Sequence, residues 1–512
     1  MIFDKKISLS LILALLLVSS FVQRASCQES IPKYENWQNK DLLEDGFFGV
    51  STEKAYHSLL NGKSWQEIIV AVIDGGVDIR HEDLKSVIWT NKKEIPDNHI
   101  DDDKNGYIDD IHGWNFLASP KGSFQYENLD IVRDLRAAIR KNPKGPEVRK
   151  LQRELSNRIV NVANELNRTR MALQILNEIV TSIPSVHPTE KDFRNFIYKS
   201  YAQSEMLVKI VQALKSNKDY LSFKSALQTD SSKFSDQIKY YYNIDYNPRD
   251  SGNETNSAFL GNNDVIGLLP YHATHICGII GAVRNNGVGI NGVADHVKIM
   301  PLRTIPSGDY LDDDLANAIY YATNNGAKII NMSFIKRTTS KKASIDKAIR
   351  YAIGKDVLFV HGCGNNGERI SSIYYPSRKY LEGKEAKAWI EVGASNKKDD
   401  INLLAAFSNY GKDFVDIMAP GVDIYSTIPV NTYTNYNGTS MAAPIITGMA
   451  GIIRAYYPQL RAEQVKDIIL RSVVPVNHTI KTGNGQQLPF VESCLSGGIA
   501  NVYNALKLAA TF

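Results

Sequence analysis

A short polar run that leads a serine into an apolar segment is the first stretch of this sequence that could do chemistry. In residues 436–444, Asn437, Gly438 and Thr439 precede Ser440, and the apolar segment follows. A serine at the start of a helix has its hydroxyl beside unsatisfied backbone N–H groups. Those groups can be capped by the hydroxyl, or they can stabilise a developing oxyanion. Ser440 is therefore a candidate nucleophile or a plain helix cap, and this stretch alone leaves both open.

Asp74 follows the run 67–73, which is rich in β-branched residues and predicts a strand buried in a parallel sheet. Ligands and catalytic groups gather at the carboxyl ends of such strands. An aspartate is also common there as a simple turn residue. Asn365 has a similar position, in the glycine-rich turn 362–367 after a predicted strand, where asparagine tolerates left-handed backbone.

His272 and His275 stand three residues apart in a segment that predicts a helix, so they share one face. One interpretation is a metal-binding pair. No carboxylate stands at the spacing of the H-E-x-x-H motif, and the other histidines are scattered. We therefore favour one functional and one structural histidine.

An acidic loop over residues 101–109 follows the D-x-D-x-N-G pattern of calcium loops. The candidate ligands are Asp101, Asp103, Asn105 and Asp109. Alternating carboxylates can converge on one cation, and the glycine permits the sharp turn. His112 occupies the twelfth position, where an EF-hand has glutamate, so the loop is not a complete EF-hand. It either binds Ca²⁺ or is a solvated acidic turn.

These candidate residues are spread over a chain that alternates strands and helices, an order that predicts a doubly wound, mostly parallel sheet in an α/β fold. We expect strands at 297–302, 328–331, 356–361, 389–394 and 416–418, and helices at 311–324, 343–354, 441–457 and 462–472. Between the aspartate and histidine motifs, apolar residues recur at spacings of three, four and seven. That pattern predicts helices, and therefore a large helical hairpin or bundle inserted over 121–262.

Composition is that of an ordinary globular protein, with 512 residues, 43% of them hydrophobic and 22% charged. A net charge of +4 gives no case for nucleic-acid binding. Residues 1–27 are typical of an export signal, with Lys5 and Lys6 before an apolar run too short to span a membrane. No later run is long enough to do so. We predict a secreted, periplasmic or cell-surface protein; a lipid on Cys27 is a weaker alternative, because Arg24 stands where lipoprotein signals usually carry an aliphatic residue.

Taken together, the motifs resemble those of the subtilases, the subtilisin-type serine proteases. The order Asp74, His272, Ser440 is that of the subtilisin triad. The resemblance covers about 65–116 and 265–512 and leaves the helical insert outside. Its four motifs, for aspartate, histidine, asparagine and serine, are residues 70–76, 272–275, 364–367 and 437–444.

The resemblance implies a subtilisin-like three-layer α/β/α fold and a role for each residue. Ser440 would be the nucleophile and His272 the general base and then the general acid, while Asp74 would orient the imidazole. Asn365 and the Ser440 N–H would bind the oxyanion. His275 would be structural.

Substrate binding is implied for Ser333, Phe334, Ile335 and Gly364. The chain departs from the family pattern at Gly75, where a serine or threonine is usual, at Ala273, where glycine is usual, and at Ile335, which would narrow the specificity pocket. Cys277 and Cys363 stand near the histidine and asparagine motifs and could make the site thiol-sensitive.

The function implied is a secreted endopeptidase that cleaves proteins or peptides through an acyl-enzyme, with no required cofactor and Ca²⁺ as a structural ion. The alternative is a catalytically impaired subtilase fold used as a binding or scaffold protein. The predicted domains are a signal peptide (1–27), the two parts of the catalytic domain (28–120 and 263–512) and the helical insert (121–262). Substrate preference and oligomeric state stay open.

Overall fold

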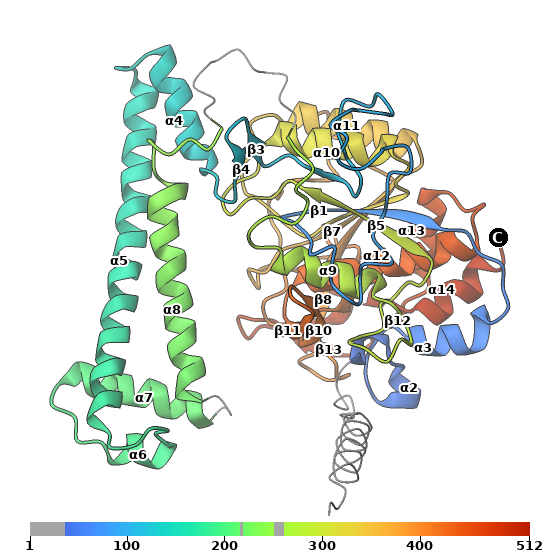
Figure 1. Cartoon of the computed structure of the whole chain (residues 1–512). Helices are drawn as coiled ribbons and strands as arrows, with labels where there is room; N and C mark the ends of the chain where they lie inside the picture. The colour runs from blue at the N-terminus through green and yellow to red at the C-terminus, as the bar shows by residue number, and fades with distance from the viewer. Residues whose placement is uncertain (1–35, 216–218, 250–260) are drawn as a thin grey trace, which may run out of the picture.

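The computed structural model describes residues 36–215, 219–249 and 261–512, so the predicted export signal and Cys27 lie outside the described residues. A nine-stranded sheet forms the centre of the main body (Figure 1). Its strands pair in parallel except at the β12–β15 edge. In spatial order they are β12 (Val474–Pro475), β15 (Gly498–Ile499), β9 (Ile417–Pro420), β8 (Trp389–Ser395), β7 (Leu358–Gly362), β6 (Ile329–Met332), β1 (Ile68–Asp74), β5 (Val297–Arg303) and β2 (Trp114–Asn115).

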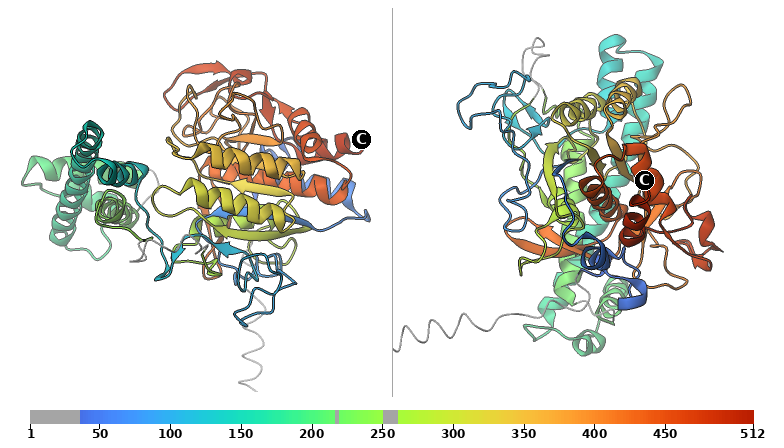
Figure 2. Two further views of the ribbon diagram at one scale, coloured as in Figure 1. Left: turned by 90° about the horizontal axis from the view of Figure 1, so that it is seen from above. Right: turned by 90° about the vertical axis from the view of Figure 1, so that its right-hand side faces the viewer.

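Helices cover both faces of this sheet (Figure 2). Successive strand residues point to opposite faces. Val70 and Val72 therefore belong to the apolar cluster that also includes residues of α9 (Tyr271–Gly281), α12 (Thr439–Tyr456), α13 (Ala462–Arg471) and α14 (Val502–Ala509). Ala71 and Ile73 belong to the cluster on the other face, with residues of α10 (Asp312–Asn324) and α11 (Lys342–Gly354). The predicted doubly wound α/β/α fold is confirmed.

Shorter elements complete the body. The hairpin β10 (Ile424–Ile428)–β11 (Thr432–Tyr436) packs against α9. The remaining elements are η1 (Trp37–Asn39), α2 (Leu42–Asp45), α3 (Thr52–Ala55), the π-turn η2 (Tyr56–Leu60), the hairpins β3 (Ala118–Ser119)–β4 (Gly122–Ser123) and β13 (Thr479–Lys481)–β14 (Gln487–Pro489), and η4 (Phe490–Glu492).

Five helices and a π-turn form an arm that projects from the body (Figures 1 and 2). They are α4 (Asp130–Lys141), α5 (Pro146–Ser182), α6 (Glu190–Asn195), α7 (Tyr201–Lys215), α8 (Tyr220–Asp236) and η3 (Gln237–Tyr241). The long helices α5 and α8 lie side by side. α6 begins with a capping box, in which Thr189 N–H donates to the Asp192 carboxylate at 2.8 Å.

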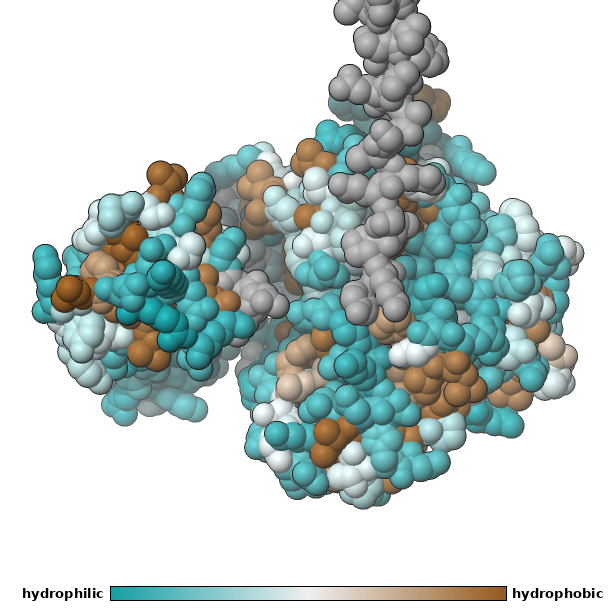
Figure 3. Space-filling view, turned by 90° about the horizontal axis from the view of Figure 1, so that it is seen from below, coloured by the Kyte–Doolittle hydropathy of each residue, from teal (hydrophilic) through white to brown (hydrophobic). Residues whose placement is uncertain are grey.

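Two small clusters of apolar side chains stabilise the arm without help from the central sheet. One joins α4 to α5 through Val132, Leu135 and Leu155. The other, at the far end, includes Leu176 and Phe193. Apolar and polar side chains are interspersed on the outer surface of that end (Figure 3). Among the described helices, none has the length and apolar character needed to cross a bilayer. The domain limits at 120/121 and 262/263 stay predictions.

Several candidate residues stand at the ends of these strands or at the start of a helix. Asp74 is the last residue of β1, Ser333 follows β6, and the turn that contains Asn365 follows β7. Because these neighbouring strands are parallel, their carboxyl ends meet at one edge of the sheet. The N-terminus of α12, with Ser440, reaches the same edge, since Ser440 Oγ lies 3.0 Å from the carbonyl oxygen of Ser333.

Candidate active site

Asp74 and His272 come together across 198 positions of sequence. His272 Nδ1 lies 3.0 Å from both carboxylate oxygens of Asp74. Asp74 is 4% exposed. The N–H of Gly75 donates to Asp74 Oδ1 at 2.7 Å, so the backbone supplies a donor where a side-chain hydroxyl is lacking. Gly76 has φ +126°, and a Cβ there would lie 2.2 Å from the carbonyl oxygen of Ile266, which explains the second glycine.

The Asp74 carboxylate changes the proton affinity of His272. Burial of the imidazole opposes its charged form, but the charge of Asp74 and its hydrogen bond outweigh that effect, so the pKa of His272 is raised above its ordinary value. The ring is still 43% exposed, which leaves the other ring edge accessible. This arrangement fixes a histidine with Nδ1 toward a carboxylate and Nε2 available to exchange a proton with a neighbouring group.

His275 has the opposite environment. It is fully buried, its Nε2 lies 3.1 Å from the carbonyl oxygen of Thr434, and its ring stacks on Tyr436 with centroids 4.5 Å apart. Burial lowers the pKa of His275 to about 3, so the ring is neutral at physiological pH. The two histidines of the motif therefore lie in different environments, and no shared metal site joins them.

Ser440 lies in the first turn of α12 and exchanges hydrogen bonds with Ser333. Its hydroxyl donates to the carbonyl oxygen of Ser333 at 3.0 Å, and the Ser333 hydroxyl donates to the carbonyl oxygen of Ser440 at 3.2 Å. That second bond is available because Pro444, four residues further along the helix, has no N–H to donate to Ser440. Between residues 261 and 512, where both side chains are described, no hydrogen bond joins Ser440 to His272.

Asn365 is held beside the start of α12. Its Oδ1 accepts hydrogen bonds from the backbone N–H and the hydroxyl of Thr439, at 2.8 and 3.1 Å. This orientation leaves Asn365 Nδ2 as a donor with no partner among the described residues. The N–H of Ser440 likewise has no acceptor there. Two unused donors at the positive end of a helix can stabilise negative charge.

The predicted substrate-binding residues line the segment after β6. The Ile335 side chain lies against Gly364, since a Cβ on Gly364 would be 2.6 Å from Ile335 Cδ1. The N–H of Phe334 and both backbone groups of Ile335 have no hydrogen bond within the described chain. The unused backbone groups therefore belong to Phe334 and Ile335, whereas the N–H of Gly364 donates to Thr439 Oγ1 at 3.2 Å and its carbonyl oxygen accepts from Asn409.

His361 also belongs to this region, although none of the sequence motifs includes it. It is 1% exposed; its Nε2 lies 2.8 Å from the carbonyl oxygen of Phe334 and its Nδ1 lies 2.8 Å from Glu391 Oε1. The other carboxylate oxygen of Glu391 accepts a hydrogen bond from Trp389. A series of hydrogen bonds from Trp389 through Glu391 to His361 therefore fixes the carbonyl group of Phe334. Its only sequence signal is a histidine at the end of a predicted strand.

The thiols expected near the site are buried. Cys277 and Cys363 are at most 1% exposed. Burial raises the pKa of both thiols well above the ordinary value, and neighbouring carboxylates add to the effect. Both cysteines are therefore buried packing residues in the thiol form. Thiol reagents should not modify them readily, which argues against a thiol-sensitive site.

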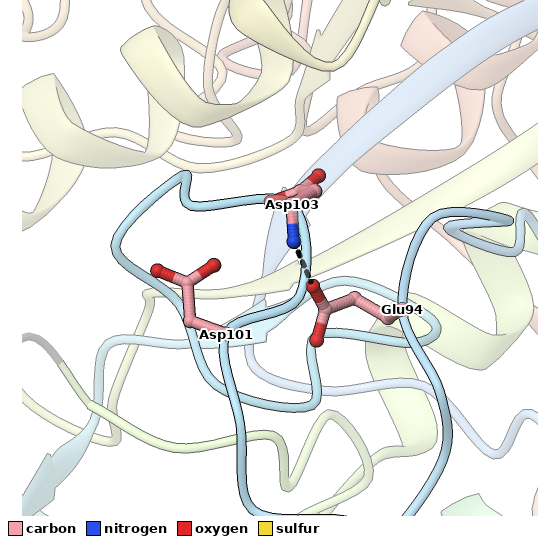
Figure 4. A group of neighbouring side chains, drawn as sticks. All are labelled: Glu94, Asp101 and Asp103. Atoms are coloured by element: carbon pink, nitrogen blue, oxygen red, sulfur yellow. Dashed lines mark hydrogen bonds between the residues drawn. The ribbon is translucent and has the colours of Figure 1, made fainter.

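The acidic loop differs in part from the prediction. Asp101 and Asp103 lie near a third carboxylate, Glu94, with oxygens of all three within 4.8 Å of one another (Figure 4). Glu94 could not be recognised from the loop pattern, because it precedes that pattern in the sequence. Asp109 does not join the group; its carboxylate accepts hydrogen bonds from the N–H groups of Asn98 and His99 at 3.3 and 3.0 Å.

Asn105 stands beside this carboxylate group. Its N–H donates to Asp101 Oδ1 at 3.0 Å and to Asp103 Oδ1 at 3.1 Å, while its own Oδ1 accepts from Tyr107. Three converging carboxylates are a ligand set of the type that Ca²⁺ prefers.

Comparison with known proteins gives one consistent family. The model of the Subtilase family (Peptidase_S8) matches residues 66–490. Subtilisin DY of Bacillus licheniformis is 37% identical over 221 residues, which are 42% of this chain and 74% of that protein. The thermophilic serine proteinase of Bacillus sp. (strain AK1) is 39% identical over 186 residues, 36% of this chain but only 43% of that protein. The solved subtilase cytotoxin SubAB assembly contains a chain 24% identical, with a TM-score of 0.40 over 47% of this chain and 77% of that chain.

Acid should destabilise the protein through His275. Its pKa is about 3 in the folded state and about 6.5 when unfolded, so the unfolded state binds more protons below pH 6.5. The stabilisation is complete above that pH and is lost as the pH falls toward 3, with a slope of up to about 1.4 kcal/mol per pH unit. Denaturant unfolding between pH 7 and 4, in a Ser440→Ala background to prevent self-cleavage, measures the slope.

The variant His275→Gln should show a shallower decline of the free energy of unfolding with acid. The exposed His57 provides the matched control, because His57→Gln should leave the slope unchanged. An equal slope in His275→Gln and the parent protein would contradict the assignment.

Proposed function

Because the chain belongs to the subtilase family, we propose that it is a secreted serine endopeptidase in which Ser440, His272 and Asp74 form the catalytic triad. The family and its subtilisin relatives support a serine protease. The observation that carries the triad is the pairing of the buried Asp74 carboxylate with His272 beside two unused donors, Asn365 Nδ2 and the Ser440 N–H.

In the proposed reaction, the Ser440 hydroxyl breaks its hydrogen bond to the Ser333 carbonyl oxygen and rotates toward His272. It then attacks a peptide carbonyl carbon while His272 Nε2 takes its proton. Asp74 stabilises the imidazolium that forms. The carbonyl oxygen becomes an oxyanion that accepts hydrogen bonds from Asn365 and the Ser440 N–H. The imidazolium then protonates the leaving amine, and water hydrolyses the acyl-enzyme by the same steps, which returns the proton to Ser440.

The sheet provides a place for the substrate backbone. β1 lies between β5 and β6 and ends at Asp74. The segments that follow β5 and β6 are residues 304–308 and 333–336, and they continue beyond the end of β1. Adjacent strands lie about 4.8 Å apart, so the space between these two segments is one strand wide, and we call it the substrate lane. An extended peptide in this lane would find the unused backbone groups of Phe334 and Ile335 on one side. That mode of binding favours protein or peptide substrates.

Export and calcium complete the proposal. The predicted signal over residues 1–27 supports action outside the cytoplasm, with a lipid on Cys27 as the alternative to a released protein. Glu94, Asp101 and Asp103 are the proposed ligands of a structural Ca²⁺. The proposed chemistry itself assigns no step to the ion.

One observation favours the alternative of a catalytically impaired binding protein. The hydroxyl of Ser440 is engaged by Ser333 rather than by His272. Catalytic hydrogen bonds are often long in unliganded enzymes and tighten only when substrate binds, so a rotation of this small side chain is compatible with activity.

Reaction with a fluorophosphonate separates the two functions, because the probe labels a serine only when a neighbouring base activates it. We expect one label per chain, lost in Ser440→Ala and retained in Ser182→Ala, a change of an exposed serine on the arm. In Asn365→Leu, kcat should fall by about 10² to 10³, the loss known for the equivalent donor of subtilisin. Folded protein that never labels would support the binding protein instead.

The raised pKa of His272 predicts the pH profile of kcat/KM. The base must be neutral, so activity should rise with pH through a midpoint above the ordinary value of about 6.5. Asp74→Asn removes the charge that raises this pKa and should lower kcat by about 10⁴. Peptide hydrolysis between pH 5 and 9 measures both effects. A flat profile from pH 5 to 8 would exclude His272 as the base.

Calcium should stabilise the protein through the three carboxylates. A ligand that binds only the folded state at about 100 times its Kd adds about 2.7 kcal/mol to the free energy of unfolding. We expect Ca²⁺ to raise the Tm of chelator-treated protein, and Glu94→Gln with Asp101→Asn to abolish that rise. Asp467→Asn, which alters an exposed ion pair elsewhere, is the control. An equal rise in the double variant would place calcium at another site.

A further inference from the structure

Arg303 is a buried cation that the proposed reaction does not use. It is the last residue of β5 and stands opposite Asp74 in the parallel β1–β5 ladder. Its side chain is only 1% exposed. A guanidinium in such a place is costly unless its N–H groups find acceptors. The segments that supply these acceptors therefore indicate what the residue does.

The guanidinium of Arg303 donates hydrogen bonds to three separate segments. Nε donates to the carbonyl oxygen of Gly75 at 3.3 Å, and Nη1 donates to Asp264 Oδ2 at 3.3 Å. Nη2 donates to the carbonyl oxygen of Phe124 at 2.7 Å and lies 3.4 Å from Gln125 Oε1. One side chain thus joins the turn after β1, the segment before α9 and the root of the helical arm.

The bond to Gly75 acts on the residue that also holds Asp74. The N–H of Gly75 donates to Asp74 Oδ1 at 2.7 Å, while its carbonyl oxygen accepts from Arg303. Glycine has no Cβ to restrict its backbone, so an external hydrogen bond is an effective restraint at this position. A shift of Gly75 would move its N–H away from the carboxylate that pairs with His272.

Residues 264–267 are held against the same guanidinium. Asp264 accepts the N–H of Gly267 at 3.0 Å through Oδ1 and pairs with Arg303 through Oδ2. Gly267 has φ +67°, and a Cβ there would lie 2.3 Å from Arg303 Nε, so this residue packs directly on the guanidinium. Helix α9 begins four residues after Gly267. The segment therefore sets the position from which His272 reaches its carboxylate partner.

The third contact reaches the root of the arm. Phe124 and Gln125 stand between the β3–β4 hairpin and α4. The carbonyl oxygen of Gln125 also accepts the N–H of Ser307, in the segment after β5, at 2.8 Å. The root of the arm and the two segments that lead to Asp74 and His272 consequently share one buried anchor.

We propose that Arg303 is a positioning residue for the Asp74–His272 pair, because its guanidinium fixes the Gly75 turn and the segment before α9 relative to each other. This role rests on the proposed protease function. Without the planar fork of donors, each segment could shift on its own, and small misplacements of catalytic groups are costly to the rate. A lysine could keep the charge but could not bond to all three segments in the same geometry.

The surroundings of His272 make its proton affinity a measure of this positioning. Asp74 is the one charged group that acts on the imidazole among the described residues. His275, one turn further along α9, has a pKa of about 3 and is neutral. Burial and the charge of Asp74 raise the pKa of the Cys277 thiol, which keeps its proton. A change in the pKa of His272 therefore reports on its contact with Asp74.

The variant Arg303→Lys tests the role while retaining the buried charge. Contact with Asp74 raises the pKa of His272, so a looser contact should lower it toward the ordinary value of about 6.5. We expect the midpoint of the pH profile of kcat/KM to fall and kcat at the optimum to decrease about tenfold. KM should change little, because Arg303 has no hydrogen bond to the proposed substrate-binding residues within the described chain. Peptide hydrolysis between pH 5 and 9 measures these effects.

Arg454→Lys provides the matched control. Arg454 of α12 is 4% exposed and pairs with Asp356 at 2.5 Å. Asp356 precedes β7, so this pair lies toward the edge of the sheet opposite the carboxyl ends of the strands. Any loss of stability in this variant should leave the midpoint and kcat unchanged. A midpoint in Arg303→Lys equal to that of the parent protein would overturn the proposal, and so would an equal shift in Arg454→Lys.

A second variant and a measurement without turnover complete the test. Gly267→Ala displaces the guanidinium without changing any charge, and it replaces Arg303→Lys if that protein does not fold. NMR titration in a Ser440→Ala background gives the pKa of His272, whose signal is assigned by its loss in His272→Gln. We expect a lower pKa in either variant than in the Ser440→Ala parent. Equal values would exclude the positioning role, whereas a parent protein that cleaves no peptide would count against the proposed function alone.

Discussion

The contact between the Asp74 carboxylate and the His272 imidazole is the interaction on which the rest of the site depends. A carboxylate that is 4% exposed is costly unless it is paired and hydrogen-bonded. The end of β1 supplies Asp74 and its Gly75 donor, and α9 supplies His272 from the layer packed over the same strand. The contact therefore depends on three features together: the sheet, the helix layer packed on it, and the tight turn at Gly75 and Gly76.

A second constraint lies at the start of α12. The same first turn presents the Ser440 hydroxyl, the free Ser440 N–H and the Thr439 groups that orient Asn365. Pro444 removes one helical hydrogen bond and so leaves the Ser440 carbonyl to Ser333. Ser440 and the proposed substrate-binding segment are thereby linked through backbone and hydroxyl groups.

Most of the fold could be predicted from the sequence because its signals are local. Buried β-branched runs, helical spacings and motif order identify β1, the strand and helix alternation and the four motif regions. Glu94, His361 and Glu391 could not be found in this way, since each becomes meaningful only through a partner on another segment. A loop pattern also cannot show that the Asp109 carboxylate accepts hydrogen bonds from the N–H groups of Asn98 and His99, and its role as a metal ligand stays a prediction. Which residues form the triad, and where the domains end, stay predictions.

The arm explains how a long insertion can be added to this fold without disturbing the site. It leaves the body after the β3–β4 hairpin, which follows the edge strand β2, so no ladder of the central sheet has to open to admit it. Its own two apolar clusters supply most of its packing, and the entropy of closing a longer loop grows only slowly with length. Its ends are then tied down by charge: Arg249 pairs with Glu127 at 2.7 Å and with Asp314 at 2.5 Å, while Asp130 pairs with Lys336. Since Lys336 ends the segment 333–336 that borders the proposed substrate lane, its bond to Asp130 links the arm directly to that segment.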